Sequence, residues 1–228
     1  MDFPVNNLHE DGLILIDKPL KLTSFGAVKK VRYLLKGKKT GHAGTLDPLA
    51  SGLVILCTGK ATKIIEGIQA QTKVYEGKIF LGATTPSFDL ETEPVFTSSS
   101  HIPSTEEIMA AAKSFEGEID QVPPIYSAIK VGGERAYNFA REGKELELKS
   151  RKINVYSFAI TEINYPLVSF KIECSKGTYI RSLANDIGQK LGVGGYLAEL
   201  RRTKIGEYDV KQAFTLEAFE EKVKNESF

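Results

Sequence analysis

A glycine-rich loop that runs into a buried strand is the feature that most constrains the fold of this chain. Residues 38–60 read KKTGHAGTLDPLASGLVILCTGK, with glycines and a proline around Asp47 and the apolar run LVILC after them. Glycine and proline allow tight backbone geometry, and the apolar run predicts a core strand. A loop held by a core strand can present one polar side chain rigidly. Asp47 is therefore a candidate catalytic residue, although an ordinary surface turn at Asp-Pro fits this stretch equally well.

The charge pattern sets Asp47 apart from its surroundings. It is the only carboxylate between Asp17 and Glu66, whereas ten lysines and arginines fall in the same interval. The whole chain carries a net charge of only +1, because its acidic residues collect later in the sequence. A local excess of cations predicts a binding site for a polyanion rather than a uniformly basic protein.

A helix is expected to begin at Thr23 or Ser24 and to end at Gly37. One face carries basic residues, which usually mark a solvated surface, but the absence of nearby acids favours a surface that faces phosphates. The positions expected to point inward are Phe25, Val28, Val31, Leu34 and Leu35, and the basic positions are Lys29, Lys30, Arg32 and Lys36.

The rest of the chain alternates between strand and helix patterns. Strands are predicted at 12–16, 72–81, 153–163 and 168–174, and helices at 59–68, 104–115, 178–191 and from 216 onward. Residues 197–210, LAELRRTKIGEYDV, predict a short helix followed by an edge strand. Residues 121–152 contain two prolines together and a double glycine, and predict a flap over an extended ligand with a helix near 134–141. No linker marks a second full domain, so we expect one domain spanning 1–228 with this insertion.

Two other side chains are notable from their positions alone. Tyr75 shares a strand face with Ile79 and Leu81, which favours a packing role over a catalytic one. Arg181 lies in the first turn of a predicted helix, where the helix dipole disfavours a cation. We therefore expect Arg181 to have an anionic partner.

The cysteines and the N-terminus bear on cofactors and location. Cys57 and Cys174 lie in apolar patterns and lack the spacing of a metal site. The first residues, MDFPVNNLHEDG, do not form a basic-then-apolar leader. No apolar run approaches the roughly 20 residues that cross a bilayer. We expect a cytoplasmic monomer without a metal or a membrane association.

Six ordered motifs together resemble the bacterial tRNA pseudouridine synthase B family, whose members isomerise uridine 55 in the T-loop of tRNA. They span residues 12 to about 210. They are DKPLKLTS (17–24), GHAGTLDPLASGLVILCTGKATK (41–63), KVYEGKIFLGATTPSFD (73–89), QVPPIYSAIKVGGERAYNFAREG (121–143), KGTYIRSLANDIGQKLG (176–192) and LRRTKIG (200–206).

The resemblance implies an α+β protein with the pseudouridine synthase fold, in which helices flank a mixed, largely antiparallel sheet. It implies a reaction on the T-arm stem-loop of tRNA that needs no redox cofactor and no metal. Many relatives carry a C-terminal RNA-binding module called PUA. The stretch after Phe214 is too short for one, so we expect no separate C-terminal domain.

The resemblance also implies roles for individual residues. Asp47 occupies the position of the catalytic aspartate, Tyr75 that of the tyrosine on the target base, and Tyr179 that of a further active-site tyrosine. Arg181 corresponds to the arginine that pairs with the catalytic carboxylate. The substrate-binding residues implied are His42 beside the flipped nucleotides, Leu200 in the base pocket, and Lys18 with Pro19 in a hairpin next to the site. The basic residues expected to follow phosphates are Lys29, Lys30, Arg32, Arg201, Arg202 and Lys204.

Two departures from the family pattern concern loops. Lys21 stands where relatives usually have glycine, and the loop after Asp89 reads DLET instead of ending in glycine. Two other functions compete with the one that the family implies. A phosphoryl-transfer enzyme would need a phosphate-binding G-x-x-x-x-G-K-[ST] motif and a second acid near Asp47, and neither is present. An RNA-binding or tRNA-folding protein with the same fold and little catalysis is the remaining alternative.

Overall fold

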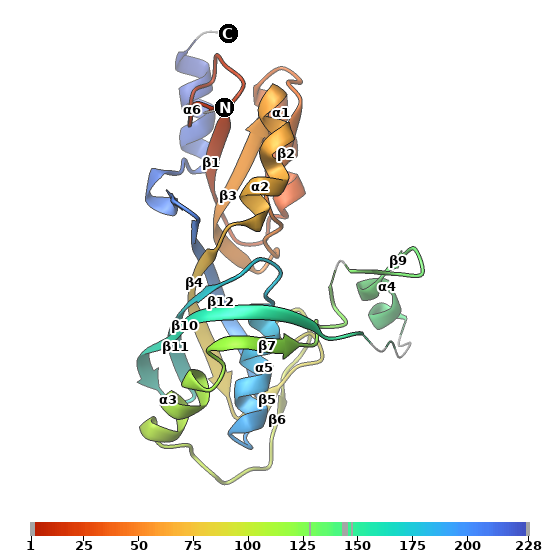
Figure 1. Cartoon of the computed structure of the whole chain (residues 1–228), viewed down its shortest axis with the longest axis vertical. Coiled ribbons are helices and arrows are strands. Elements are labelled where there is room, and N and C mark those ends of the chain that lie inside the picture. The colour runs from red at the N-terminus through yellow and green to blue at the C-terminus, as the bar shows by residue number, and fades with distance from the viewer. Residues whose placement is uncertain (1–2, 128, 143–145, 147, 227–228) are drawn as a thin grey trace. The chain divides into compact units, whose positions relative to one another are not determined.

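The computed structural model describes residues 3–127, 129–142, 146 and 148–226. The chain divides into two compact units, one formed by residues 1–75 and 200–228 and the other by residues 76–199. Two strands run from one unit into the other, β4 (Lys73–Leu81) and β12 (Gly195–Ile205) (Figure 1). Whether the chain behaves as one domain with an insertion stays a prediction.

The first unit is built on β3 (Ala50–Thr58), which contains the apolar run LVILC. It pairs antiparallel with β1 (Leu13–Lys18) and β2 (Thr40–His42), and parallel with the second half of β12. β13 (Tyr208–Asp209) pairs antiparallel with the end of β12. The predicted strands at 12–16 and after Asp47 are therefore confirmed. The buried cluster between these strands and the following helices contains Leu13, Leu15, Leu53, Ile55, Cys57, Ala61, Ile68 and Ile205.

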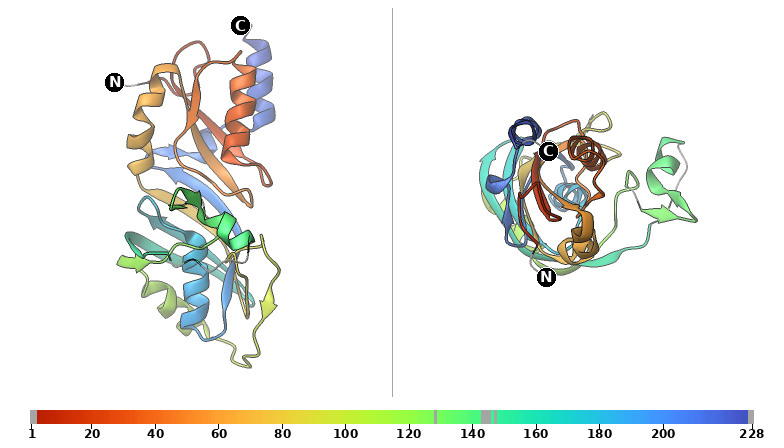
Figure 2. Two further views of the ribbon diagram at one scale, coloured as in Figure 1. Left: turned by 90° about the vertical axis from the view of Figure 1, so that its right-hand side faces the viewer. Right: turned by 90° about the horizontal axis from the view of Figure 1, so that it is seen from above.

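Helices cover this part of the sheet. The longer ones are α1 (Ser24–Leu34) and α6 (Leu216–Asn225), which lie side by side (Figure 2). The shorter ones are η1 (Gly59–Ile64), α2 (Ile65–Ala70) and η2 (Val210–Gln212). The hydroxyl of Thr23 caps α1 by accepting a hydrogen bond from the N–H of Gly26.

The prediction that Phe25 points into the core is wrong. Its side chain is 60% exposed, whereas Ala27, Val28 and Val31 are buried. Residues at i, i+3 and i+4 share a helix face, so burying Ala27 and Val31 turns Phe25 outward.

The second unit has the strand order β12, β4, β11 (Leu167–Cys174), β10 (Arg151–Asn164) and β7 (Gly117–Gln121). β10 is antiparallel to both of its neighbours. Because β3 and β12 form a parallel pair among mainly antiparallel ones, the expected mixed, largely antiparallel sheet is confirmed. Helices α3 (Thr105–Lys113) and α5 (Ile180–Lys190) contact each other, and α3 begins with a capping box of Ser104 and Glu107.

Two small sheets lie outside this ladder. β5 (Ala83–Thr84) pairs with β6 (Val95–Phe96). Between β7 and β10, β8 (Lys130–Val131) pairs with β9 (Glu134–Arg135), and α4 (Ala136–Arg141) follows (Figure 1). The predicted helix near 134–141 is confirmed.

The short helix predicted in residues 197–210 is wrong, because this stretch lies mainly in β12 and β13. Leucine, alanine, glutamate and arginine favour helices, but tertiary pairing overrides such weak propensities. The pairing is close at Gly52, which has a φ of +108°. A Cβ there would lie 2.3 Å from the carbonyl oxygen of Arg202, so only glycine fits.

Cys57 and Cys174 are buried and free of disulfides, as expected for small core residues. Among the described residues, no helix is long and apolar enough to cross a membrane.

Candidate active site

Asp47 lies in a loop of residues 43–49, here called the Asp47 loop, and its side chain is half-buried. Hydrogen bonds hold the loop at successive positions. The hydroxyl of Ser24 donates to the carbonyl oxygen of Leu46 (3.1 Å) and accepts from the Leu46 N–H (2.8 Å). The N–H of Ala50 donates to the carbonyl oxygen of Asp47 (3.1 Å), and the N–H of Lys21 to that of Pro48 (2.7 Å). The backbone that carries Asp47 is thus fixed on both sides of the residue.

Lys18 does not present its ammonium group to a ligand, contrary to the role expected for it in substrate binding. Its side chain is fully buried, and Nζ donates to the carbonyl oxygens of Pro19 (2.9 Å), Leu22 (2.7 Å) and Ala50 (2.6 Å). These bonds join the hairpin after β1 to the end of the Asp47 loop. Pro19 is exposed within that hairpin.

The charge of Asp47 also affects the pKa of Lys18. Burial lowers the pKa of Lys18 to about 8, the charge of Asp47 opposes this change, and the charge of Arg202 adds to it. The Asp47 carboxylate and the buried Lys18 ammonium therefore lie close enough for their charges to interact. Opposite charges at short range favour the ionised form of a carboxylate.

Arg202 is the second buried cation, and its expected role in following phosphates is wrong. Its side chain is 1% exposed. Nε donates to the carbonyl oxygen of Leu53 (2.8 Å), and the terminal nitrogens donate to those of Thr45 (3.2 Å) and Gly44 (3.2 Å). Arg202 therefore ties the first half of the Asp47 loop to β3.

The neighbouring arginine behaves differently. Arg201 forms two hydrogen bonds with the carboxylate of Asp17, at 3.0 and 2.7 Å, and its side chain is 41% exposed. Its guanidinium is partly accessible but already has a carboxylate partner.

Three further expected site residues belong to the same unit as Asp47. His42 is the last residue of β2, opposite Leu56 of β3, and burial lowers the pKa of its imidazole, which keeps it neutral at neutral pH. Leu200 is half-buried and pairs with Ala50 at the end of the Asp47 loop. Tyr75 lies in β4, the strand next to β12, and its side chain is 9% exposed.

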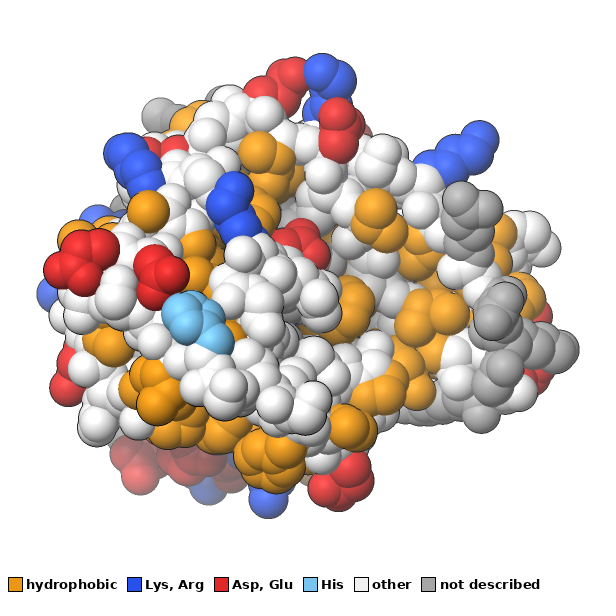
Figure 3. All heavy atoms as spheres, turned by 90° about the horizontal axis from the view of Figure 1, so that it is seen from below, with side chains coloured by type: hydrophobic (Ala, Val, Ile, Leu, Met, Phe, Trp, Pro, Cys, Tyr) orange, Lys and Arg blue, Asp and Glu red, His pale blue; other side chains and the backbone are white. Residues whose placement is uncertain are grey.

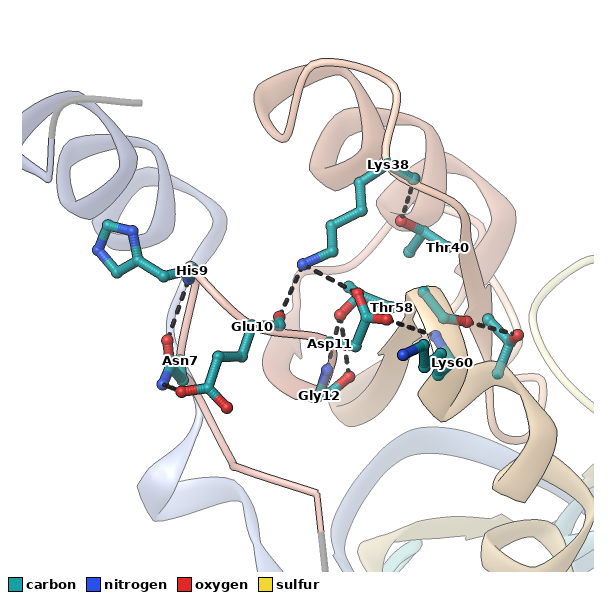
Figure 4. Close-up of polar contacts among 11 residues, drawn as sticks. Asn7, His9, Glu10, Asp11, Gly12, Lys38, Thr40, Thr58 and Lys60 are labelled. Atoms are coloured by element: carbon teal, nitrogen blue, oxygen red, sulfur yellow. Dashed lines mark hydrogen bonds and ion pairs between the residues drawn. The ribbon is translucent and has the colours of Figure 1, made fainter.

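Two of the lysines between residues 18 and 65 form ion pairs with acidic residues outside that interval. Lys30 forms an ion pair with Glu220 of α6 (3.4 Å). Lys38 donates to the carbonyl oxygen of Glu10 and forms an ion pair with Asp11 (3.2 Å), whose carboxylate also accepts from the N–H of Lys60 (Figure 4). The expectation that the basic face of α1 lacks acidic partners is therefore wrong for Lys30. Lys29 and Arg32 are exposed.

Arg181 and Tyr179 lie in the second unit, at the start of α5. Arg181 is 4% exposed, and its terminal nitrogen is 3.4 Å from a carboxylate oxygen of Asp89 and 3.4 Å from the carbonyl oxygen of Ser87. The expected anionic partner of Arg181 thus includes Asp89, which the sequence did not suggest. The pairing of Arg181 with Asp47 joins residues of different units and stays a prediction.

Tyr179 is held at the N-terminus of α5 by Gln121 at the end of β7. The Gln121 side-chain amide donates to the carbonyl oxygen of Tyr179 (3.0 Å) and accepts from its N–H (2.8 Å). The guanidinium carbon of Arg151 lies 4.7 Å from the centre of the Tyr179 ring, which is a cation–π geometry. The side chain of Tyr179 is half-buried.

The supporting residues Ser24, Asp17, Asp89 and Gln121 were not predicted from the sequence. A signal existed for Ser24, because Thr23 already supplies the helix cap and the next hydroxyl is left for another bond. Asp17, Asp89 and Gln121 lie inside the six family motifs, but their partners are remote in sequence. Among the described residues, no group of three or more His, Cys, Asp or Glu side chains is placed to hold a metal ion.

Comparisons with known proteins bear on the class of this site. Residues 32–180 match the model of the TruB family pseudouridylate synthase N-terminal domain, and residues 181–227 match that of the tRNA pseudouridylate synthase B C-terminal domain. A chain in the crystal structure of a Cbf5-Nop10-Gar1 complex shares the fold, with a TM-score of 0.71 and 31% identity over 93% of this chain. A chain in the structure of an H/ACA RNP bound to a substrate RNA containing 2'-deoxyuridine gives a TM-score of 0.67. This chain spans about half the length of those two chains, 55% and 51%.

The fold is therefore that of the pseudouridine synthases. Similarity to curated sequences is higher and extends over nearly the full length. The tRNA pseudouridine synthase B of Flavobacterium johnsoniae is 52% identical over 93% of this chain and 96% of the relative. The protein of the same name from Chloroherpeton thalassium is 50% identical over 96% of this chain and 93% of the relative. The chain belongs to the TruB family of pseudouridylate synthases.

Proposed function

We propose that this protein converts uridine 55 in the T-loop of tRNA to pseudouridine, with Asp47 as the catalytic carboxylate. The observation that carries the proposal is the Asp47 loop, where hydrogen bonds from residues 18–24 and from Arg202 hold the backbone around one half-buried acid. Such preorganisation is a requirement of catalysis. Full-length similarity to proteins named tRNA pseudouridine synthase B supports the same reaction.

The reaction is an isomerisation. The bond between the ribose and N1 of uracil breaks, the base turns while bound, a bond to C5 forms, C5 loses its proton, and N1 gains one. An ionised Asp47 can act on the sugar or the base, and an opposite charge as near as that of Lys18 favours the ionised form of a carboxylate. Tyr75 is proposed to contact the uracil and Tyr179 to complete the site. The base must leave the RNA stack to react, and neutral His42 is proposed to brace the vacated space, with Leu200 lining the pocket.

Arg181 is proposed to pair with Asp47 as well as with Asp89. Arg181→Met should abolish measurable product formation and lower the free energy of unfolding, because buried Asp89 loses its cation. Thermal unfolding and single-turnover assays measure the two effects separately. A variant that is less stable but fully active would show that Arg181 serves only Asp89.

The T-arm stem-loop is proposed to contain most of the recognised structure, in a cytoplasmic enzyme that acts as a monomer without a cofactor. A T-arm stem-loop should then be modified almost as efficiently as whole tRNA, measured as kcat/KM. Binding should weaken steeply with salt, because contacts to phosphates release counterions. A stem-loop modified hundreds of times more slowly would show that recognition extends beyond the T-arm.

The direct test is incubation with an unmodified tRNA transcript, followed by chemical labelling and primer extension. A single pseudouridine at position 55 is the expected result. Modification at another uridine would reject the site specificity. Tight binding without product would instead favour the tRNA-folding alternative.

A further inference from the structure

The outer face of α1 is composed entirely of aromatic and basic side chains. Its exposed residues are Phe25, Lys29, Arg32 and Tyr33, and Lys36 follows the helix. The Phe25 side chain is 60% exposed and the Tyr33 side chain 83%. Spacings of three and four residues place Phe25, Lys29, Arg32 and Tyr33 on one side of the helix, and Lys36 lies just beyond its C-cap. Lys29 Nζ lies 5.1 Å from the centre of the Phe25 ring, so cation and aromatic ring are adjacent.

This composition differs from that of an ordinary solvated surface. On the face shown in Figure 3, side chains of both charges are present and hydrophobic side chains are spread among them. No acid occurs between Ser24 and Lys36. Lys30 of α1 does have a carboxylate partner, Glu220 of α6. However, Lys30 is half-buried and is not part of the outer face of α1.

The outer face of α1 begins next to the Asp47 loop. Ser24 is the first residue of α1, and its hydroxyl binds Leu46, the residue before Asp47. A helix rises about 1.5 Å per residue, so Phe25 and Tyr33 are separated by roughly 12 Å along the axis. A strand of RNA that leaves the catalytic loop along α1 would meet both rings and the cations between them.

We propose that this aromatic-basic face of α1 binds unpaired nucleotides of the substrate RNA that flank the target uridine. Phe25 and Tyr33 stack on bases, and Lys29, Arg32 and Lys36 contact the phosphates between them. Exposed rings interleaved with cations match single-stranded nucleic acid, which offers a base face and a charge at each step. The inference rests on the proposed function, because it assumes an RNA substrate at Asp47.

The experiment measures binding of a T-arm stem-loop transcript across a salt series. Phe25→Ala with Tyr33→Ala should raise Kd about tenfold or more, with little change in the slope of log Kd against log salt. Lys29→Ala with Arg32→Ala should reduce that slope by about one for each phosphate that the variant no longer neutralises. Tyr33→Phe keeps the ring and should bind as the wild type does. Tyr156→Ala, which removes a 51% exposed tyrosine of β10, is the matched control and should have no effect.

The outcomes separate the two proposals. All four substituted α1 side chains are exposed, and thermal unfolding checks that the variants fold. If the wild type forms pseudouridine but the aromatic double variant binds RNA normally, the stacking inference is wrong and the proposed function stands. If the wild type forms no pseudouridine at any RNA concentration, the proposed function fails. Loss of RNA binding by Tyr156→Ala would also reject the inference, because RNA binding would then not be specific to the tyrosine on α1.

Discussion

Two regions of the first unit use their cations in opposite ways. Behind the Asp47 loop, Lys18 and Arg202 are enclosed and donate to backbone carbonyl groups. On the outer face of α1, Lys29 and Arg32 are exposed and lie among aromatic rings. The cations of this unit therefore divide into buried ones, which hold the Asp47 loop, and exposed ones, which we propose contact RNA.

The difference follows from the cost of burying polar groups. A buried carbonyl without a hydrogen-bond donor is costly, and a charged donor that serves three of them offsets its own desolvation. An exposed cation is solvated by water and need not donate to buried carbonyl groups, so it can contact a phosphate. The following substitutions test this division.

Asp47→Asn should have the largest effect, a loss of product formation by about a thousandfold or more. The amide keeps the shape of the side chain but lacks the charge. RNA affinity should stay within a few-fold of the wild type, because the phosphate contacts lie elsewhere. Single-turnover assays and binding measurements check the two statements. Turnover of this variant at the same uridine would reject the role of Asp47.

Arg202→Met should lower the free energy of unfolding by about 3 kcal/mol or more, because three carbonyl groups lose their donor. The Asp47 loop should lose its fixed geometry, so kcat should fall more than KM rises. Urea unfolding and steady-state kinetics provide the measurements.

Arg201→Met is the matched control for Arg202→Met. Arg201 is next in sequence but pairs with Asp17 in a partly exposed bridge, worth about 1 kcal/mol or less. Equal destabilisation by the two variants would contradict the distinction between interior and exterior cations.

Lys18→Met tests the buried ammonium group of Lys18 through the pH dependence of the free energy of unfolding. The pKa of Lys18 is lowered from 10.5 to about 8 in the folded chain. Between these values the unfolded chain binds more protons, so this group makes the wild type more stable as the pH rises. The stability of the wild type relative to Lys18→Met should therefore increase from about pH 8 to about pH 10.5, by up to roughly 1.4 kcal/mol per pH unit.

The Lys18 comparison must be made as a difference between the two proteins. Burial raises the pKa of the Cys57 thiol to about 12, which lowers stability over much of the same pH range, but equally in both proteins. A difference that does not vary with pH would show that Lys18 stays charged throughout.

Lys21→Gly should have the smallest effect. Lys21 has a φ of +63°, a conformation that glycine adopts freely, while its N–H bonds to Pro48. Relief of this strain and the greater freedom of the unfolded glycine oppose each other, so stability should change by less than about 1 kcal/mol. A tenfold loss of kcat/KM with unchanged stability would reveal a contact between the Lys21 side chain and RNA.

The sequence alone determined that one acid stands apart from its surroundings and where the main strands lie. Asp47 is isolated among cations, and the apolar runs at 12–16 and 53–57 belong to β1 and β3. These signals are local, because a strand core needs consecutive apolar residues and a helix face needs a regular spacing. The capping box before α3 and the position of Arg181 in the first turn of α5 were readable for the same reason.

Only the tertiary structure decided which cations are buried, which helix face is exposed and which carboxylate meets Arg181 in its own unit. The partners of Arg202 are carbonyl groups of Gly44, Thr45 and Leu53, about 150 residues away in sequence. Phe25 is exposed because Ser24 binds Leu46 and Ala27 is buried, and together these set the rotation of α1. The strand at 197–205 overrides its helix-favouring composition because β3 offers a pairing edge. Each of these outcomes depends on groups brought together by folding, and no local pattern encodes such contacts.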